Sequence, residues 1–277
     1  MNLKCDFLVS KFAFKVNLHR YAVEAFLSTA STPVTDAAAL HAIRLISTYL
    51  RPAVRSPPDE FNKARDMLTY AEFLAGLAFN SAGLGLTHAM SNQICALYPN
   101  VPLSECTAVI LPHVLQYYGE QSVENDDEEN VTELFVDLAA ALGCPAAAES
   151  PAAATVPAVV RSVARLASDV KLPETLNELN ARRRAGMKKD DIPEVAAKAL
   201  TDPGGITAPC DPTLGKIESL FCRAWDTGLT GAAEVGSLEA KPAKETGWNV
   251  RCNRVNASEY LDFNDAAAMI EETIELE

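Results

Sequence analysis

The chain has 277 residues, a formal net charge of −13 and 48% hydrophobic residues, with a mean hydropathy near zero. That length supplies one large domain or two small ones, with a sizeable core. The negative charge argues against a nucleic acid or an anionic membrane as partner, because both require a basic surface. No apolar run approaches the roughly 18–20 residues that span a bilayer.

The seven cysteines are odd in number and form no CxxC motif. This usage predicts free thiols in a reducing compartment. Residues 1–16, "MNLKCDFLVSKFAFKV", resemble neither a signal peptide nor a transit peptide. We therefore expect a cytoplasmic protein, with organellar targeting left open.

Abundant alanine, with Val and Ile not dominant, predicts an all-α fold, a bundle of several helices. The first helix is expected at residues 18–30, where apolar residues recur near helical spacing. Thr32 and Pro33 then provide an N-cap and a first-turn proline for a second helix. That helix is expected to end before Pro52.

Asp59 can cap a third helix that runs to about Asn80, after a turn at "SPPD". The stretch "SAGLGL" interrupts the helical pattern. Gly83 and Gly85 indicate a tight junction or a close backbone approach there. The next helix is expected to begin near Leu86.

Ser104 is the expected N-cap of a helix in which Pro112 is a kink or a late stop. The acidic run 123–130 is expected to be a solvated connection, followed by a helix at 131–143. The Pro- and Ala-rich segment 144–157 has the composition of a linker.

A helix at 157–170 follows this linker. Asp190 or Asp191 is expected to cap a helix over "IPEVAAKAL", and Asp211-Pro212 to start the last one, "TLGKIESLFCRAW". The basic segment 180–189 is predicted to be a solvated loop.

No series of strands, no βαβ alternation and no Gly-rich phosphate loop is apparent in the sequence. Residues 229–277 are expected to form a partly disordered extension with one acidic helix at 264–276.

Six sequence blocks, in order and correctly spaced, resemble the C-terminal helical domain of the iron-containing (group III) alcohol dehydrogenases. They are "VEAFLSTASTPVTDAAALHAIRLISTYL", "LAGLAFNSAGLGLTHAM", "VPLSECTAVILPHV", "LPETLNEL", "GMKKDDIPEVAAKAL" and "APCDPTLGKIESLFCRAW". The resemblance covers residues 17–228. Residues 1–16 are an atypical segment outside it.

Members of this family are two-domain oxidoreductases for alcohols and aldehydes. The resemblance implies an N-terminal domain that binds NAD(P) and a helical domain that holds Fe²⁺ or Zn²⁺. By this resemblance we expect the chain to begin where the second domain begins. For the chain alone we therefore expect no cofactor. The partners that the resemblance implies are a separate coenzyme-domain chain or a second copy of this chain.

The resemblance places the four metal-ligand positions of the family at Asn17, Tyr21, His88 and Leu103. Only His88 retains a histidine. Asn92, four residues after His88, replaces a second histidine near the substrate, and we expect Asn92 and Phe79 to lie in the substrate cleft. The family's "NPR" near the end of the domain is here Ala208-Pro209-Cys210.

A divalent ion in an open catalytic site needs about three or more protein ligands. His88 alone does not meet that need, so a vestigial site and an inactive chain are expected. Three alternatives stay open: a maleylacetate reductase-like fragment, which an asparagine at position 17 also fits, a non-catalytic interaction or oligomerisation module, and a decayed or mispredicted gene product.

Other histidines and cysteines carry no motif. His19, His41 and His113 are expected to be structural or surface residues. The cysteines at positions 95, 106 and 210 do not have a spacing that supports a metal site with His88. A free cysteine also commonly packs as a small hydrophobic residue.

Overall fold

A computed structural model describes residues 17, 19–55, 62–124, 128–144 and 152–230 of the chain. All regular structure in these residues is helical, and no strand occurs among them. This confirms the all-α prediction.

Residue 17 and residues 19–27 are helical and form the first helix. The helices that follow are α2 (Pro33–Arg55), α3 (Asn62–Ala82), α4 (Leu86–Leu97), α5 (Leu103–Glu124), α6 (Glu128–Ala141), α8 (Ala152–Asp169), α9 (Leu176–Arg183), α10 (Ile192–Leu200) and α11 (Leu214–Asp226). Two short 3₁₀ turns, η2 (Lys189–Asp191) and η3 (Pro203–Gly205), flank α10.

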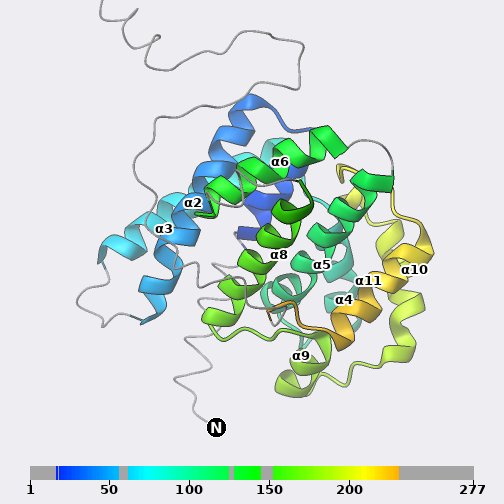
Figure 1. Cartoon of the computed structure of the whole chain (residues 1–277). Coiled ribbons are helices and arrows are strands. Elements are labelled where there is room, and N and C mark those ends of the chain that lie inside the picture. Colours follow the sequence, from blue (N-terminus) through cyan, green and yellow to red (C-terminus); the bar gives the residue numbers. More distant parts are fainter. Residues whose placement is uncertain (1–16, 18, 56–61, 125–127, 145–151, 231–277) are drawn as a thin grey trace, which may run out of the picture.

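The helices form a bundle around α5, which contacts α4, α6, α8, α9 and α11. In Figure 1, α2 and α3 lie side by side at one end of the molecule, and α10 and α11 lie at the other end. α4 packs between α5 and α10. The chain therefore crosses the bundle several times, which brings residues far apart in sequence into one core.

α5 is the central helix of the bundle. Nearly every side chain from Glu105 to Gly119 is buried, on all sides of the helix. A helix that is apolar all round is a core helix rather than a surface one. Ile110, Val114 and Leu115 are fully inaccessible to solvent.

Pro52 and Pro157 do not mark helix boundaries as predicted, and of the two alternatives at Pro112, a kink or a late stop, the stop is wrong. α2 continues past Pro52 to Arg55, and α5 continues past Pro112 to Glu124. α8 begins at Ala152, inside the predicted linker, and contains Pro157. An interior proline removes one backbone hydrogen bond, at a cost of about 3 kcal/mol. Close packing of the surrounding side chains, such as fully buried Leu50 and Ala53 in α2, offsets that cost.

The predicted N-caps are only partly correct. α5 begins at Leu103, so Ser104 lies inside its first turn. Asp191 does stand at the N-cap of α10, but its side chain accepts a hydrogen bond from the hydroxyl of Tyr98 rather than from the helix. The cap of α11 is Thr213, which accepts from the backbone N–H of Lys216, and not Asp211.

The basic segment 180–189 is not a solvated loop throughout, because its first four residues belong to α9. Arg183, the last residue of that helix, forms an ion pair with Glu105 of α5. Glu105 is 1% exposed. A neighbouring basic residue, Arg182, pairs instead with Glu178 at the surface.

The junction predicted from the glycines is confirmed. Gly83 has φ +79°, a conformation that L side chains rarely adopt. At Gly85 a Cβ atom would lie 2.9 Å from Oε1 of Glu24. The two glycines end α3 and allow α4 to begin against the first helix.

Several predictions fall outside the described residues. They concern the turn and cap at 56–59, the middle of the acidic run at 125–127, the first part of the predicted linker at 145–151, and the extension from 231 onward. None of the described helices is both long and apolar enough to cross a membrane.

Candidate functional site

The first helix, α3 and α4 bring three of the predicted site residues together. The ring of Tyr21 stacks on that of Phe79, with 4.6 Å between centroids and 23° between planes. The imidazole of His88 also lies near the Tyr21 ring, with 6.5 Å between ring centroids and 44° between planes. Tyr21 therefore contacts both Phe79 and His88.

His88 forms a hydrogen bond with Asn92, one turn later on α4. Its Nε2 atom lies 3.0 Å from Nδ2 of Asn92, and the spacing of four residues places both side chains on one face of the helix. Its Nδ1 atom is buried and has no hydrogen-bond partner in the described part of the chain. The turn η3 covers the ring, because a Cβ atom on Gly204 would lie 2.7 Å from Cδ2 of His88.

The surroundings of His88 favour its neutral form. Burial lowers the pKa of the imidazole below its usual value, and the nearby Arg20 guanidinium lowers it further. Glu24 and Asp202 act in the opposite direction without reversing the shift.

Glu24 caps α4 from another helix. Gly85 at the N-cap of α4 offers no side chain. Instead, Oε1 of Glu24 accepts hydrogen bonds from the backbone N–H groups of Thr87 at 2.8 Å and His88 at 3.3 Å. A carboxylate at a helix N-terminus satisfies unpaired donors and is favoured by the helix dipole. This contact fixes the turn that carries His88.

The other carboxylate oxygen of Glu24 binds Arg20. The Oε2–Nη1 distance is 2.8 Å, and the two side chains are 2% and 1% exposed. The guanidinium also donates to Oδ1 of Asn17 from Nε at 3.3 Å and from Nη2 at 3.1 Å. Its Cζ atom lies 3.7 Å from the centroid of the Tyr21 ring. Arg20 thus contacts two of the four positions that the resemblance assigns to metal ligands.

Asn17 is engaged from a second side as well. The hydroxyl of Thr107, on α5, donates to the same Oδ1 atom at 3.2 Å. Leu103, the fourth ligand position, lies one turn before Thr107 on α5, and residues four apart share a face of a helix. Its side chain is a hydrocarbon and offers no donor atom to a metal.

The donor set does not fit a divalent ion. Within the part of the chain that the structure describes, no three His, Cys, Asp or Glu side chains come close enough together to hold a metal ion. The oxygen of Asn17 already accepts from Arg20 and Thr107, and a guanidinium beside it repels a second cation.

Comparison with known proteins decides the family. The model of the C-terminal region of the Fe-containing alcohol dehydrogenase family matches residues 15–225 of this chain. The chain belongs to the iron-containing alcohol dehydrogenase family.

Curated relatives in this family include alcohol and diol dehydrogenases. The chain is 37% identical over 205 residues to 1,3-propanediol dehydrogenase of Citrobacter freundii. The aligned residues cover 74% of this chain and 48% of the relative. The chain is also 35% identical over 201 residues to alcohol dehydrogenase 4 of Schizosaccharomyces pombe, covering 73% and 42%. The chain therefore spans about half the length of the curated relatives it matches.

Solved structures of the family share the fold. The crystal structure of a 1,3-propanediol oxidoreductase matches 77% of this chain and 51% of its own, with 34% identity and a TM-score of 0.67. Maleylacetate reductase from Agrobacterium tumefaciens matches 79% and 53%, with a TM-score of 0.60. At 21% identity the second likeness shows the fold alone.

Sequence reasoning missed Arg20, Glu24 and Thr107. The first two stand four residues apart on the first helix, a spacing usual for exposed ion pairs. Their signal lay in their neighbours, because Ala22, Val23 and Phe26 leave the helix apolar on several sides. A charged pair on such a helix must be buried and matched.

The other histidines and cysteines form no second site among the described residues. His19 and His113 are 1% and 3% exposed, and burial lowers the pKa of each to about 4. The five described cysteines are free thiols.

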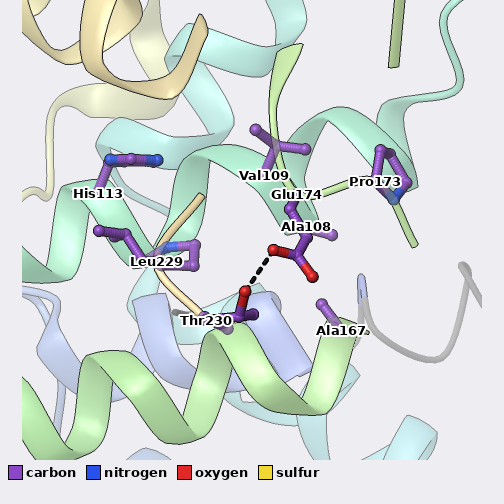
Figure 2. Close-up of a pocket in the computed structure, with 10 residues that line it drawn as sticks. Ala108, Val109, His113, Ala167, Pro173, Glu174, Leu229 and Thr230 are labelled. Atoms are coloured by element: carbon purple, nitrogen blue, oxygen red, sulfur yellow. Dashed lines mark hydrogen bonds between the residues drawn. The ribbon is translucent and has the colours of Figure 1, made fainter. Parts of the chain in front are cut away.

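A small cavity near His113 does not accept a ligand either. Figure 2 shows it between Ala108, Val109 and Glu174. The hydroxyl of Thr230 donates a hydrogen bond to the carboxylate of Glu174 across it. Its volume is about 10 Å³, which is at most enough for one water molecule. Leu229 and Thr230 line it, so the chain after α11 returns to pack on α5 and α8.

Proposed function

We propose that this chain is the helical domain of an alcohol or aldehyde oxidoreductase in which the metal-dependent reaction has been lost. The ancestral activity would use NAD(P) and a divalent ion, as the family resemblance implies. A bound Fe²⁺ or Zn²⁺ would polarise the alcohol or carbonyl oxygen during hydride transfer. The chain as it stands is inactive in this proposal, and its expected location is the cytoplasm.

One observation carries the proposal. Of the four positions that correspond to metal ligands, only His88 has an imidazole, and its Nε2 atom is bonded to Asn92. Asn17 is committed to Arg20 and Thr107. One imidazole gives a divalent ion far fewer than the three or more protein ligands of an open catalytic site.

Metal content and coenzyme oxidation test the proposal directly. The chain is expressed with added Fe²⁺ or Zn²⁺, and its metal content is measured by elemental mass spectrometry. We expect a metal content well below one ion per chain, unchanged in His88→Ala, and no NAD(P)H oxidation with short aldehydes. A stoichiometric ion that His88→Ala releases, or steady NAD(P)H oxidation by the chain, would refute the proposal.

A second candidate is a maleylacetate reductase-like role. Two observations favour it, the fold likeness to such a reductase and the asparagine at position 17. The discriminating assay supplies maleylacetate and NAD(P)H in the presence of a chelator, together with a coenzyme-binding domain added as a separate chain. Chelator-resistant turnover supports this role, and its absence favours the inactive domain.

The partner is proposed to be a second copy of the chain or a chain that carries a coenzyme-binding domain. Size exclusion with light scattering gives the mass in solution. A dimer mass supports a role in oligomerisation. A strict monomer that also captures no coenzyme-domain chain counts against the interaction module.

A further inference from the structure

A buried positive charge lies beside Tyr21. Arg20 is 1% exposed, and its guanidinium is held by Glu24 on one side and by Asn17 on the other. The ring of Tyr21 lies against it, at a distance typical of a cation–π contact. The charge is therefore enclosed by protein groups on three sides.

Burying an arginine is costly unless its donors and charge are matched. Here three donor atoms of the guanidinium, Nε, Nη1 and Nη2, each donate a hydrogen bond to Asn17 or Glu24. The planar guanidinium provides this fork, which a compact ammonium group does not. Such a matched site differs from a chance surface ion pair.

The contacts of Arg20 also connect three helices. Through Asn17 it reaches Thr107 on α5, and through Glu24 it reaches the first turn of α4, including the backbone N–H of His88. A divalent ion bound by side chains from several helices would cross-link the same elements. The arginine supplies both the positive charge and the links between helices.

We infer that the Arg20 guanidinium has taken over the structural role of a divalent cation at this site. It neutralises Glu24, fixes Asn17 and holds the first helix against α4 and α5 without a metal ion. The inference rests on the proposed function, in which the chain holds no metal. It predicts a guanidinium-binding site in the variant Arg20→Ala, because that change removes Cγ, Cδ and the guanidinium together.

The test is chemical rescue with N-ethylguanidinium, which has the same atoms that Arg20→Ala removes. We expect Arg20→Ala to lower the Tm by on the order of 10 °C, because Glu24 remains buried without its counter-charge. N-ethylguanidinium at ten times its Kd should restore roughly 3–5 °C of that loss. The neutral near-isostere N-ethylurea should restore none.

The matched control is Arg182→Ala, which removes an arginine from an exposed pair with Glu178. Its Tm and that of the wild type should not respond to N-ethylguanidinium. Addition of EDTA should also leave the wild-type Tm unchanged. Rescue by N-ethylurea as well, or an Arg20→Ala variant as stable as the wild type, would overturn the inference.

A second pair of variants keeps the inference testable if Arg20→Ala does not fold. Arg20→Lys retains a positive charge, whereas Arg20→Gln has a neutral side chain. We expect the lysine variant to be the more stable of the two, and the reverse order overturns the inference. Stoichiometric metal in the wild type would refute the proposed function. A metal-free wild type together with an Arg20→Ala variant as stable as the wild type would refute only this inference.

Discussion

Two buried glutamates hold this molecule together in different ways. Glu24 pairs with Arg20 on its own helix, and both side chains are closed off from water. Glu105 pairs with Arg183, which comes from α9 and is 27% exposed. Both carboxylates are almost fully buried, but only the Arg20 cation is buried as well.

The difference indicates what each pair does. Arg183 keeps contact with solvent and ties α9 to α5 from the edge of the bundle, so water screens part of its charge. Arg20 has no such screening and relies on Asn17, Glu24 and Tyr21. A pair that is fully desolvated at both ends must be matched more completely than a pair at the rim.

The largest expected effect comes from breaking the inner pair. Glu24→Gln keeps an oxygen for the N–H groups of Thr87 and His88 but leaves the Arg20 charge buried. We expect a loss of about 3–5 kcal/mol in the free energy of unfolding, measured by urea denaturation. Arg20→Met should cost a similar amount.

The double variant Arg20→Met with Glu24→Gln completes the cycle. Its loss should be much smaller than the sum of the single losses, because both charges leave together. Additive losses would show that the two side chains do not act as a pair.

The buried histidines differ from the buried ion pair, because a buried imidazole avoids the cost of desolvation by staying neutral. His19, next to Arg20 in sequence, has a pKa lowered to about 4 by burial and by the nearby Arg51. The unfolded chain takes up a proton near pH 6.5 and the folded chain near 4, so stability present above pH 6.5 is lost as the pH falls toward 4.

For His19 that loss is on the order of 3 kcal/mol. The variant His19→Leu removes this titration while retaining a buried apolar side chain. We expect the unfolding free energy of this variant to depend less steeply on pH between 6.5 and 4. The measurement is urea denaturation at several pH values in this range. An unchanged slope would contradict the assignment of His19 as a buried neutral base.

A smaller effect is expected at the rim. Arg183→Met removes the partner of Glu105, and we expect a loss of about 2 kcal/mol in the free energy of unfolding, because solvent reaches this end of the pair. The neighbouring exposed Arg184→Met is the matched control and should be close to neutral. A loss at Arg183 as large as that at Arg20 would remove the distinction between the two pairs.

The smallest effect is expected at the surface pair of Arg182 and Glu178, whose side chains are 43% and 39% exposed. Arg182→Ala should change the unfolding free energy by less than about 0.5 kcal/mol, since exposed pairs contribute little. A loss above 1 kcal/mol would mean that packing of the arginine stem, rather than burial of the charge, sets the order of the three pairs.

The helices were predictable where local signals agree with packing. The break at Gly83 and Gly85 and the helix from Leu86 follow from the sequence, because glycine permits the backbone that the junction needs. Pro52 and Pro157 were misread as boundaries. Their local cost is real, but burial of the helices around them is a property of the whole bundle.

The candidate site was predictable as a set of positions and not as a set of contacts. Spacing alone places Asn92 on the same helix face as His88, whereas the hydrogen bond between them is seen only in the structure. Spacing does not show that Glu24 caps α4, because the two partners lie 63 residues apart. The cap also requires Gly85, where a Cβ atom would meet the carboxylate.

The sequence by itself determined the helical class of this protein, the family it resembles and the side chains at the four ligand positions. Only the tertiary structure decided that Arg20 is enclosed and that its guanidinium binds the oxygen of Asn17. The reason is physical: side-chain identity and periodicity are local, whereas the burial of a charge and the choice of its partners depend on how distant helices pack.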